Sequence, residues 1–313
     1  MKVVIIGDFT EGSKKRIRER FPADWSIAIV SAGEAEDEIA DAEVIIPEHI
    51  RVDGPFLDRT GKLKLVQTGA GFDNVMIPEC TKRGIYVANG AGVNTVAVAE
   101  HVLAFICCWF KNMIFLDGIM KRGEYGVDYD GAEIEGKTLG IIGMGSIGKA
   151  VAHRALAFGM KVLGHDIRPV ETEPGVEMTE LAGLLKTADV VTLHTFLNEQ
   201  TRHMIGRSEL ASMKRSAFLI NTSRGPVVDE AALIEALEMN RIAGAGLDVF
   251  EKEPLAPDSP LRRMKNVILT PHTAGMPDGL KFHQKRYAFF LENITRVSEG
   301  KVPLNALNRI SAS

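Results

Sequence analysis

The sequence predicts an α/β protein built from two doubly wound parallel sheets. Short apolar, β-branched runs alternate with charged, helix-like stretches along the chain, and these runs fall into two separate series. Parallel strands need helical crossovers and are covered on both faces, so each one is a short, nearly continuous apolar run. The length of 313 residues is also that of about two domains.

The first series of predicted strands occupies residues 3–6, 27–30, 44–46, 63–67 and 85–88. The second series occupies residues 138–142, 161–165, 190–194, 217–221, 244–249 and 267–270. Charged segments between the strands, such as residues 14–21, have the pattern of surface helices. Residues 281–297 follow the last strand, and we expect this helix to cross back to the first domain.

The long segment from Thr95 to Lys121 separates the two series. It is apolar over much of its circumference, so we predict one long helix with most of its sides buried. The pattern fits a helix in a domain core and equally well a helix shared between domains or subunits.

Composition and charge argue against several classes of function. The formal net charge of −4 offers neither a basic surface for nucleic acid nor a polybasic patch for a membrane. The longest apolar stretch, residues 97–110, is too short to span a bilayer and contains Glu100 and His101. The first strand runs directly into Asp8, which is not the pattern of a signal peptide.

The cysteines indicate a reducing compartment. Cys80, Cys107 and Cys108 form no Cys-x-x-Cys pair, so neither a disulfide framework nor a zinc site is predicted. No His or Cys spacing indicates another metal site. We therefore expect a cytoplasmic protein that holds no metal.

A glycine fingerprint follows the first strand of the second series. Gly143-Met144-Gly145-Ser146-Ile147-Gly148 stands between residues 138–142 and a helical pattern at 149–159. The first glycine makes a tight turn, the second lets a pyrophosphate approach the backbone, and the third lets helix and strand pack closely. The helix amino terminus then faces the anion. A glycine turn without a ligand is the alternative, which the position between strand and helix disfavours.

Asp166 narrows the nucleotide to NAD. It ends the next predicted strand, about 20 residues beyond the glycines, where a carboxylate accepts hydrogen bonds from the adenosine ribose. The same charge would repel the 2′-phosphate of NADP. Arg168 stands two residues later and would offset part of that repulsion.

Three candidate catalytic residues follow successive strands of the second series. Oxidising an alcohol needs a base for the hydroxyl proton and a cation for the carboxylate of the acid, while the cofactor accepts the hydride. Arg224 follows the strand at 217–221, Glu253 follows 244–249 and His272 follows 267–270. In an open α/β sheet, ligands bind where the carboxyl ends of the strands meet.

These residues give the chain a resemblance to the D-isomer-specific 2-hydroxyacid dehydrogenase family. Besides the glycine fingerprint, the matching segments are Asn221-Thr222-Ser223-Arg224-Gly225 with Val228-Asp229-Glu230, Gly246-Leu247-Asp248-Val249-Phe250 with Glu253-Pro254, Pro271-His272, Gly69-Ala70-Gly71-Phe72-Asp73-Asn74, and Val93-Asn94-Thr95 through Ala99-Glu100-His101. The resemblance covers essentially the whole chain.

The resemblance implies a role for each site residue. His272 would be the acid/base, and Glu253 would fix its tautomer and favour the imidazolium. Arg224 would hold the substrate carboxylate or polarise the C2 oxygen, and Asp248 would orient the nicotinamide carboxamide. The implied substrate-binding set is Ala70, Gly71, Asn94 and Arg224. The implied cofactor-binding set is Gly143, Gly145, Ser146, Ile147, Gly148, Asp166, His194, Thr195, Thr222, Asp248 and His272.

The resemblance also implies the division of labour between the domains. Residues 1–93 and 281–313 would form the substrate-binding domain, and residues 94–280 an inserted NAD-binding Rossmann domain. The helix at 95–121 would belong to a homodimer interface. The expected activity is NAD-dependent hydride transfer to or from C2 of a small D-2-hydroxy or 2-oxo acid.

Four other functions were weighed against a dehydrogenase of small 2-hydroxy acids. Glu253 disfavours formate dehydrogenases, which resemble this fold but place a glutamine beside the histidine. Phosphite dehydrogenases keep the Arg–Glu–His set and stay possible. Phosphoglycerate dehydrogenases tend to offer basic groups near residues 47–51, where Glu48 would oppose a phosphate although His49 or Arg51 would help it. A non-catalytic NADH-sensing protein would need no acid/base pair.

The sequence departs from the family pattern at two places, and each departure leads to an expectation. The opposition of Glu48 to a phosphate favours an unphosphorylated acid such as glyoxylate, hydroxypyruvate or glycerate. Phe196 stands where the family usually has a proline, so contacts near the cofactor are expected to be altered there.

Overall fold

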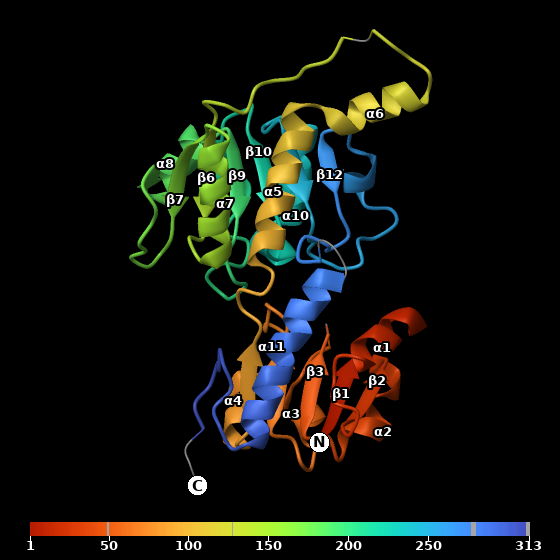
Figure 1. Ribbon diagram of the computed structural model, residues 1–313. Helices are drawn as coiled ribbons and strands as arrows, with labels where there is room; N and C mark the ends of the chain where they lie inside the picture. The colour runs from red at the N-terminus through yellow and green to blue at the C-terminus, as the bar shows by residue number, and fades with distance from the viewer. Residues whose placement is uncertain (49, 127, 277–279, 311–313) are drawn as a thin grey trace. The chain divides into compact units, whose positions relative to one another are not determined.

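The computed structural model describes residues 1–48, 50–126, 128–276 and 280–310, with the backbone alone at 280–283. His49, considered above beside Arg51, lies outside the described residues. The chain divides into unit 1, Met1–Asn94 with Asp278–Ser313, and unit 2, Thr95–Pro277. Unit 2 is therefore an insertion in the sequence of unit 1 (Figure 1). The two units are described separately.

Unit 1 is built on a five-stranded parallel sheet of order β2-β1-β3-β4-β5. The strands are β1 (Lys2–Ile6), β2 (Ser26–Val30), β3 (Val44–Pro47), β4 (Leu65–Thr68) and β5 (Tyr86–Asn89). The helices are α1 (Glu11–Arg18), η1 (Ala32–Glu34), α2 (Glu36–Ile39), α3 (Gly54–Leu57), α4 (Ile77–Lys82) and α11 (Leu280–Ser298). This strand order reverses direction at β1, as in doubly wound nucleotide-binding folds.

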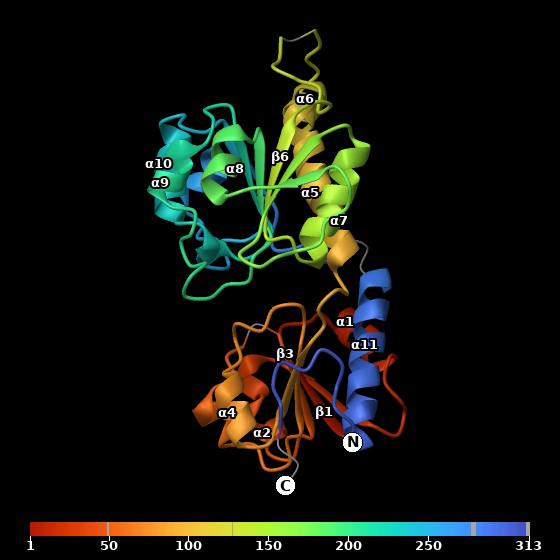
Figure 2. The ribbon, with the colours of Figure 1, turned by 90° about the vertical axis from the view of Figure 1, so that its left-hand side faces the viewer.

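Helices cover both faces of the unit 1 sheet, with α1 and α11 on one side and α2 and α4 on the other (Figure 2). Successive side chains of a strand point to opposite faces, so β1 supplies both cores. Val3 and Ile5 pack with Phe290 of α11, whereas Val4 and Ile6 pack on the side of α2, α3 and α4. The near-continuous apolar strands of the sequence are explained by this double burial.

Unit 2 is built on a seven-stranded parallel sheet of order β12-β11-β10-β9-β6-β7-β8. The strands are β6 (Thr138–Ile142), β7 (Lys161–His165), β8 (Val176–Met178), β9 (Val190–Leu193), β10 (Phe218–Asn221), β11 (Gly244–Leu247) and β12 (Val267–Leu269). The helices are α5 (Thr95–Phe110), α6 (Met113–Lys121), α7 (Ser146–Ala157), α8 (Leu181–Thr187), α9 (Arg207–Ser212), η2 (Gly225–Val227), α10 (Glu230–Glu238) and η3 (Pro260–Arg263).

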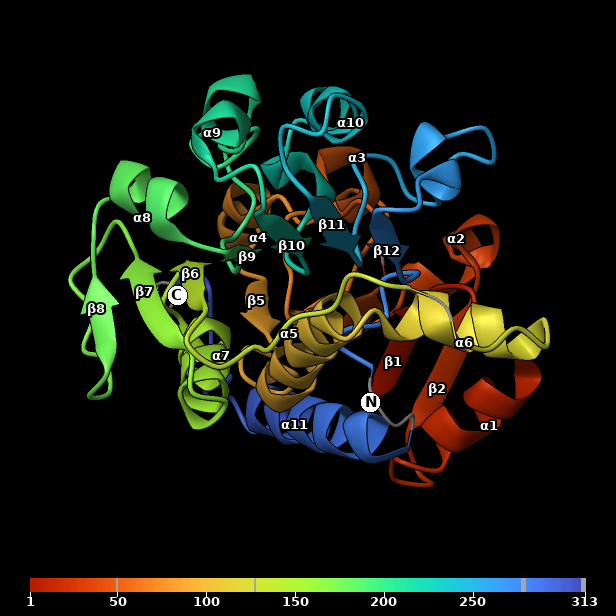
Figure 3. The same cartoon turned by 90° about the horizontal axis from the view of Figure 1, so that it is seen from above.

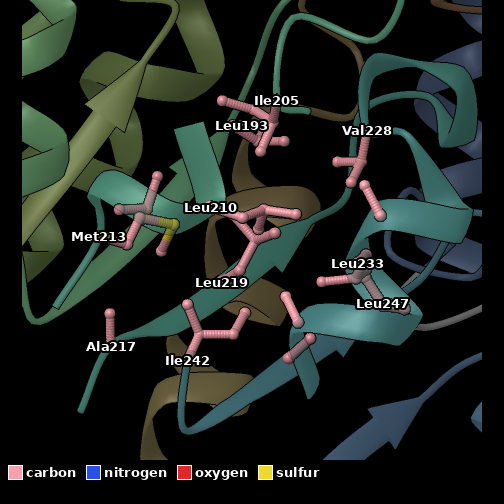
Figure 4. Packing of buried hydrophobic residues seen from close by; sticks show 14 of the residues in the cluster. Leu193, Ile205, Leu210, Met213, Ala217, Leu219, Val228, Leu233, Ile242 and Leu247 are labelled. Carbon is pink, nitrogen blue, oxygen red and sulfur yellow. The ribbon is translucent and has the colours of Figure 1, made fainter. Parts of the chain in front are cut away.

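The unit 2 sheet also lies between two helical layers. In Figure 3, α8, α9 and α10 lie along one face and α5 and α7 along the other. Figure 4 shows the first of these cores, where Leu210 of α9 and Leu233 of α10 meet strand residues such as Leu219. On the other face Phe105 of α5 packs with Phe218. The predicted fold of two parallel α/β sheets is confirmed.

The prediction of one helix over residues 95–121 was wrong. The segment forms α5 and α6, which are bent by 62° at the break. Asn112 stands at the break with φ of 51°, a left-handed conformation that asparagine tolerates better than most residues. Among the described residues no single helix is long and apolar enough to cross a membrane, and α5 and α6 reach that mark only when counted together.

The edge strand β8 was also missed. Its residues, Val176-Glu177-Met178, bury little surface, so they lack the apolar signal that revealed the central strands. The predicted carboxyl-terminal helix at 281–297 corresponds to α11, which belongs to unit 1.

Candidate active site

Five neighbouring strands of unit 2, β6 and β9 to β12, run parallel and end at the same edge of the sheet. The strand order reverses between β6 and β9, and such a switch point is where open α/β sheets bind their ligands. We call this the reactive edge. The candidate catalytic residues Arg224, Glu253 and His272 follow β10, β11 and β12, so the loops that carry them lie at this edge.

The glycine fingerprint occupies the switch point. Gly143 has φ of 96°, and a Cβ on it would lie 2.6 Å from the carbonyl oxygen of His194. A Cβ on Gly148 would collide with the carbonyl oxygen of Gly143. A Cβ on Gly145, by contrast, would meet no atom within 4 Å. The packing of the chain itself therefore requires glycine at positions 143 and 148. At position 145 the chain would admit a side chain, and the glycine leaves open space at the amino terminus of α7.

That open space suits a pyrophosphate. The loop leads into the 12-residue helix α7, whose Ser146 and Ile147 stand at the end where backbone N–H groups and the helix dipole favour an anion. A ligand can approach Gly145 where a side chain would otherwise stand. The geometry of the fingerprint therefore fits a dinucleotide.

Asp166 braces the same loop. Its Oδ2 accepts a hydrogen bond from the amide of Met144 at 3.0 Å, and its Oδ1 accepts one from the amide of Arg168 at 3.0 Å. Burial opposes ionisation, but these amides and the Arg168 guanidinium outweigh it and hold the pKa of Asp166 below its ordinary value. The carboxylate is therefore charged at neutral pH. The Arg168 side chain stands beside it, 70% exposed, with Nε 3.4 Å from Oδ1.

At the ends of β9 and β10, two buried polar atoms have no partner in the part of the chain that the structure describes. His194 Nε2 is 3.0 Å from the hydroxyl of Thr192, while its Nδ1 is buried without a partner among the described residues. Burial lowers the pKa of His194 to about 3, so the ring is neutral. The hydroxyl of Thr222 is likewise buried without a partner in the described part of the chain. Such atoms are normally satisfied, and a bound ligand would explain them.

His272 and Glu253 form the pair predicted from the sequence. His272 Nδ1 lies 2.7 Å from Glu253 Oε2, and Glu253 Oε1 accepts a hydrogen bond from the amide of Phe250 at 3.0 Å. Both carboxylate oxygens are therefore engaged, and the imidazole is fixed with its proton on Nδ1. The two side chains are 35% and 34% exposed, which leaves the pair open to a ligand.

Asp248 holds the loop that carries His272. This almost fully buried carboxylate accepts hydrogen bonds from the Thr270 hydroxyl at 2.6 Å and from the amides of Thr273 and Ala274 at 2.8 and 2.9 Å. Its backbone carbonyl accepts a hydrogen bond from the amide of His272 at 2.8 Å. The resemblance suggested a contact with nicotinamide. The structure gives Asp248 a second task, which is to fix the conformation of the His272 loop.

Arg224 lies in a loop that is pressed against the Glu253 loop. Asn221 donates to the carbonyl of Arg224 at 2.9 Å and accepts from the amide of Ser223 at 3.1 Å. A Cβ on Gly225 would collide with the carbonyl of Phe250, so only glycine allows this approach. Arg224 Nη1 donates to the carbonyl of Ser223 at 2.8 Å. The backbone therefore holds the loop of Arg224, after β10, against the loop after β11 that carries Glu253.

The remaining predicted residues belong to unit 1. Ala70 and Gly71 follow β4, and the Asn89 side chain at the end of β5 donates to the carbonyl of Ala70 at 3.0 Å. Asn94 ends the first segment of unit 1, and its Oδ1 is buried without a partner in the described residues. Phe196, the departure from the family pattern, belongs to unit 2 and is 60% exposed.

No part in the chemistry was predicted for His101 of unit 2 or for Arg286 of unit 1. The position of His101 on an apolar helix indicated a structural histidine or a subunit contact, and its Nε2 lies 3.0 Å from the Thr270 hydroxyl that donates to Asp248. Burial lowers the pKa of His101, although Asp248 opposes that effect. Arg286 of α11 is buried and pairs with Glu48. The Glu-His pattern on an apolar helix could have flagged His101, whereas no sequence signal links positions 48 and 286.

The fold and this site define an NAD-dependent oxidoreductase. Residues 103–274 match the family model for the D-isomer specific 2-hydroxyacid dehydrogenase, NAD binding domain. The chain is 38% identical to a glyoxylate reductase of Korarchaeum cryptofilum, over 98% of this chain and 96% of that protein. A D-3-phosphoglycerate dehydrogenase of Methanocaldococcus jannaschii is 36% identical over 98% of this chain but only 59% of its own length.

A solved structure agrees with these relatives. The D-lactate dehydrogenase from Aquifex aeolicus, complexed with NAD and lactic acid, matches with a TM-score of 0.88 and 31% identity, covering 99% of this chain and 100% of that one. The chain therefore belongs to the D-isomer-specific 2-hydroxyacid dehydrogenase family. The expected family and the NAD cofactor are confirmed.

Proposed function

We propose that this protein reduces a small, singly charged 2-oxo acid to the D-2-hydroxy acid, with His272 as the proton donor. The observation that carries the proposal is the His272–Glu253 pair, 2.7 Å long and one third exposed at the reactive edge. With Nδ1 held by Glu253, Nε2 is the nitrogen that exchanges a proton with the C2 oxygen. In the oxidising direction the same nitrogen accepts the hydroxyl proton.

Arg224 supplies the positive charge that the reaction needs. Its planar fork of donors matches a carboxylate, and it also stabilises negative charge on the C2 oxygen. NADH, when bound, supplies the hydride that adds to C2. The amides of Ala70 and Gly71 and the Asn94 side chain are proposed to bind the substrate carboxylate from unit 1. The glycine loop, His194, Thr195, Thr222 and Asp248 are proposed to line the cofactor.

The substrate is proposed to be an unphosphorylated acid such as glyoxylate or hydroxypyruvate. The relative from Korarchaeum cryptofilum is named glyoxylate reductase and matches over nearly its whole length. The phosphoglycerate dehydrogenase relative extends well beyond the matched part, so it supports phosphoglycerate less directly. Phosphite dehydrogenase activity remains the other alternative for the same Arg–Glu–His set.

Asp166 supports NADH over NADPH. Its charged, braced carboxylate stands where the adenosine ribose hydroxyls are expected, and it would repel a 2′-phosphate. The exposed guanidinium of Arg168 tempers that repulsion, so we expect a preference for NADH without strict exclusion of NADPH.

The protein is proposed to act as a homodimer in the cytoplasm. Helix α6 exposes several large apolar side chains, between 46% and 56% of their surface, namely Met113, Ile114, Phe115 and Met120. Exposed apolar groups gathered on one element are typical of a surface that a partner covers. Light scattering on the purified chain would give twice the monomer mass. The three free cysteines suit a reducing compartment.

The direct test is a screen of NADH oxidation with glyoxylate, hydroxypyruvate, pyruvate, phosphohydroxypyruvate and bulkier 2-oxo acids. Turnover of one or more small acids would support the proposal. Tight binding of NADH without turnover of any acid would instead support the NADH-sensing alternative, and turnover of phosphite with NAD would support the phosphite alternative.

A further inference from the structure

A buried ion pair lies at the carboxyl edge of the unit 1 sheet. Glu48 directly follows β3, and its Oε1 accepts a hydrogen bond from Nη2 of Arg286, which α11 contributes. Only 15% of the Glu48 side chain and 7% of the Arg286 side chain are exposed. Two charges so far removed from water must be compensated, and here they compensate each other.

The guanidinium of Arg286 rests on the loop that is proposed to bind the substrate carboxylate. A Cβ on Gly69 would lie 3.3 Å from Arg286 Nη2, so the guanidinium touches the backbone that leads into Ala70 and Gly71. The Cζ atom of Arg286 lies over the ring of Phe290, 5.1 Å from the ring centroid. Its Nε is buried and has no hydrogen-bond partner among the described residues. A cation with an unused donor therefore stands at this loop.

The backbone of Glu48 is held at the edge of the sheet. Its amide donates to the carbonyl of Ile6 at 2.9 Å, and a Cβ on Gly7 would lie 2.9 Å from the Glu48 Cβ. The backbone and Cβ of Glu48 are thus held at the ends of β1 and β3, while the Arg286 guanidinium extends from α11 to the loop after β4.

We propose that Glu48 neutralises Arg286 and thereby makes this edge select 2-oxo acids with one negative charge over acids that carry a second anionic group, such as a phosphate. The inference rests on the proposed function, because the substrate must lie on the Ala70–Gly71 loop to sense the pair. With the pair intact, a second anion meets no net positive charge. With Glu48 neutral, the Arg286 guanidinium attracts that anion at short range.

The test compares kcat/KM for hydroxypyruvate and phosphohydroxypyruvate in the wild type and in Glu48→Gln. The glutamine keeps the shape of the side chain and removes its charge. We expect the ratio to shift at least about tenfold toward the phosphorylated acid, with hydroxypyruvate changed by no more than about threefold. Two controls should keep the wild-type ratio: Glu48→Asp, which retains the charge, and Glu43→Gln, which removes a charge paired with Lys64 at the start of β3.

Two further variants make the inference falsifiable even where Glu48→Gln folds poorly. The double variant Glu48→Gln/Arg286→Met carries neither charge and should return to the wild-type ratio. Arg286→Met alone leaves Glu48 uncompensated and should shift the ratio away from the phosphorylated acid. An unchanged ratio in either folded single variant, or a shift that persists in the double variant, would overturn the inference. Failure of the wild type with every 2-oxo acid would instead overturn the proposed function on which it rests.

Discussion

The two sheets each carry a carboxylate paired with a basic group at their carboxyl edge, and the two pairs differ in exposure. In unit 2, about a third of His272 and of Glu253 is exposed. In unit 1, Glu48 and Arg286 are almost wholly buried. An exposed pair can exchange a proton with a ligand, whereas a buried pair fixes the local balance of charge. We therefore assign the chemistry to unit 2 and the sensing of substrate charge to unit 1.

The largest predicted effect tests whether the reactive edge supplies the cation. Arg224→Gln should lower kcat/KM for the preferred 2-oxo acid by about a hundredfold or more, because charge-assisted hydrogen bonds to the carboxylate contribute about 1.5–3 kcal/mol each. Arg215→Gln is the matched control, since Arg215 bonds only the carbonyl of Asn240 among the described contacts, on the exposed surface of unit 2. Equal activities of the two variants would remove Arg224 from the site.

The next prediction tests the close approach of the two loops that build this edge. Gly225→Ala should lower the free energy of unfolding by about 1–3 kcal/mol and reduce activity, because the added methyl group collides with the carbonyl of Phe250. Gly12→Ala in α1 meets no atom within 4 Å and should be tolerated. Chemical denaturation measures both variants. A fully stable and active Gly225→Ala protein would show that the loops can separate without loss.

A smaller effect is expected on the preference for NADH over NADPH, which Asp166 and Arg168 are proposed to control. Asp166→Ala should reduce the ratio of kcat/KM with NADH to that with NADPH by about tenfold, because a charge that repels the 2′-phosphate is lost. Arg168→Ala should move the same ratio in the opposite direction. If neither variant changes the ratio, other groups select the cofactor.

The smallest predicted effect is on the pH dependence of the stability that Asp189 contributes to unit 2. Asp189 accepts hydrogen bonds from the amide of Thr138 at 2.8 Å and from Lys214 at 2.9 Å. Burial raises the pKa of Asp189, but these bonds outweigh it and leave the pKa below the ordinary 3.8. Asp189→Asn should therefore cost about 1 kcal/mol of stability above that pH. The cost should fade as the pH drops through the lowered pKa of the folded protein, because protonation of the wild type then removes the same charge.

The exposed ion pair of Asp41 and Lys2 in unit 1 provides the control for that measurement. Asp41→Asn removes a carboxylate that water already screens, so its effect should be much smaller. A gap between the stabilities of wild type and Asp189→Asn that does not change below pH 3.8 would mean that the Asp189 carboxylate contributes nothing as a charge.

The central strands and most of the candidate site could be predicted from the sequence because the patterns that mark them are local. The apolar runs revealed the central strands, and parallel pairing then required Arg224, Glu253 and His272 to meet at one edge. The glycine fingerprint and Asp166 lie within a single β–α–β segment. Each of these inferences depends on residues near each other in the chain, or on a general rule of sheet topology.

What the sequence did not reveal depends on packing between distant segments. Glu48 and Arg286 are 238 residues apart, and only the placement of α11 on the unit 1 sheet joins them. The break at Asn112 was missed because the apolar pattern continues from α5 into α6. The link from His101 to Asp248 was missed because it passes through Thr270, whose hydroxyl has no distinguishing pattern.

Proton transfer is assigned to the His272–Glu253 pair, and a second histidine–glutamate pair in unit 2 provides the control. His203 Nε2 also lies 2.7 Å from a glutamate, Glu251, but His203 follows β9, whereas His272 follows β12. The measurement is the initial rate of NADH oxidation with the preferred 2-oxo acid in His272→Ala and His203→Ala. We expect a loss of about a hundredfold or more in His272→Ala and near-wild-type turnover in His203→Ala. Near-wild-type turnover in His272→Ala would contradict that assignment.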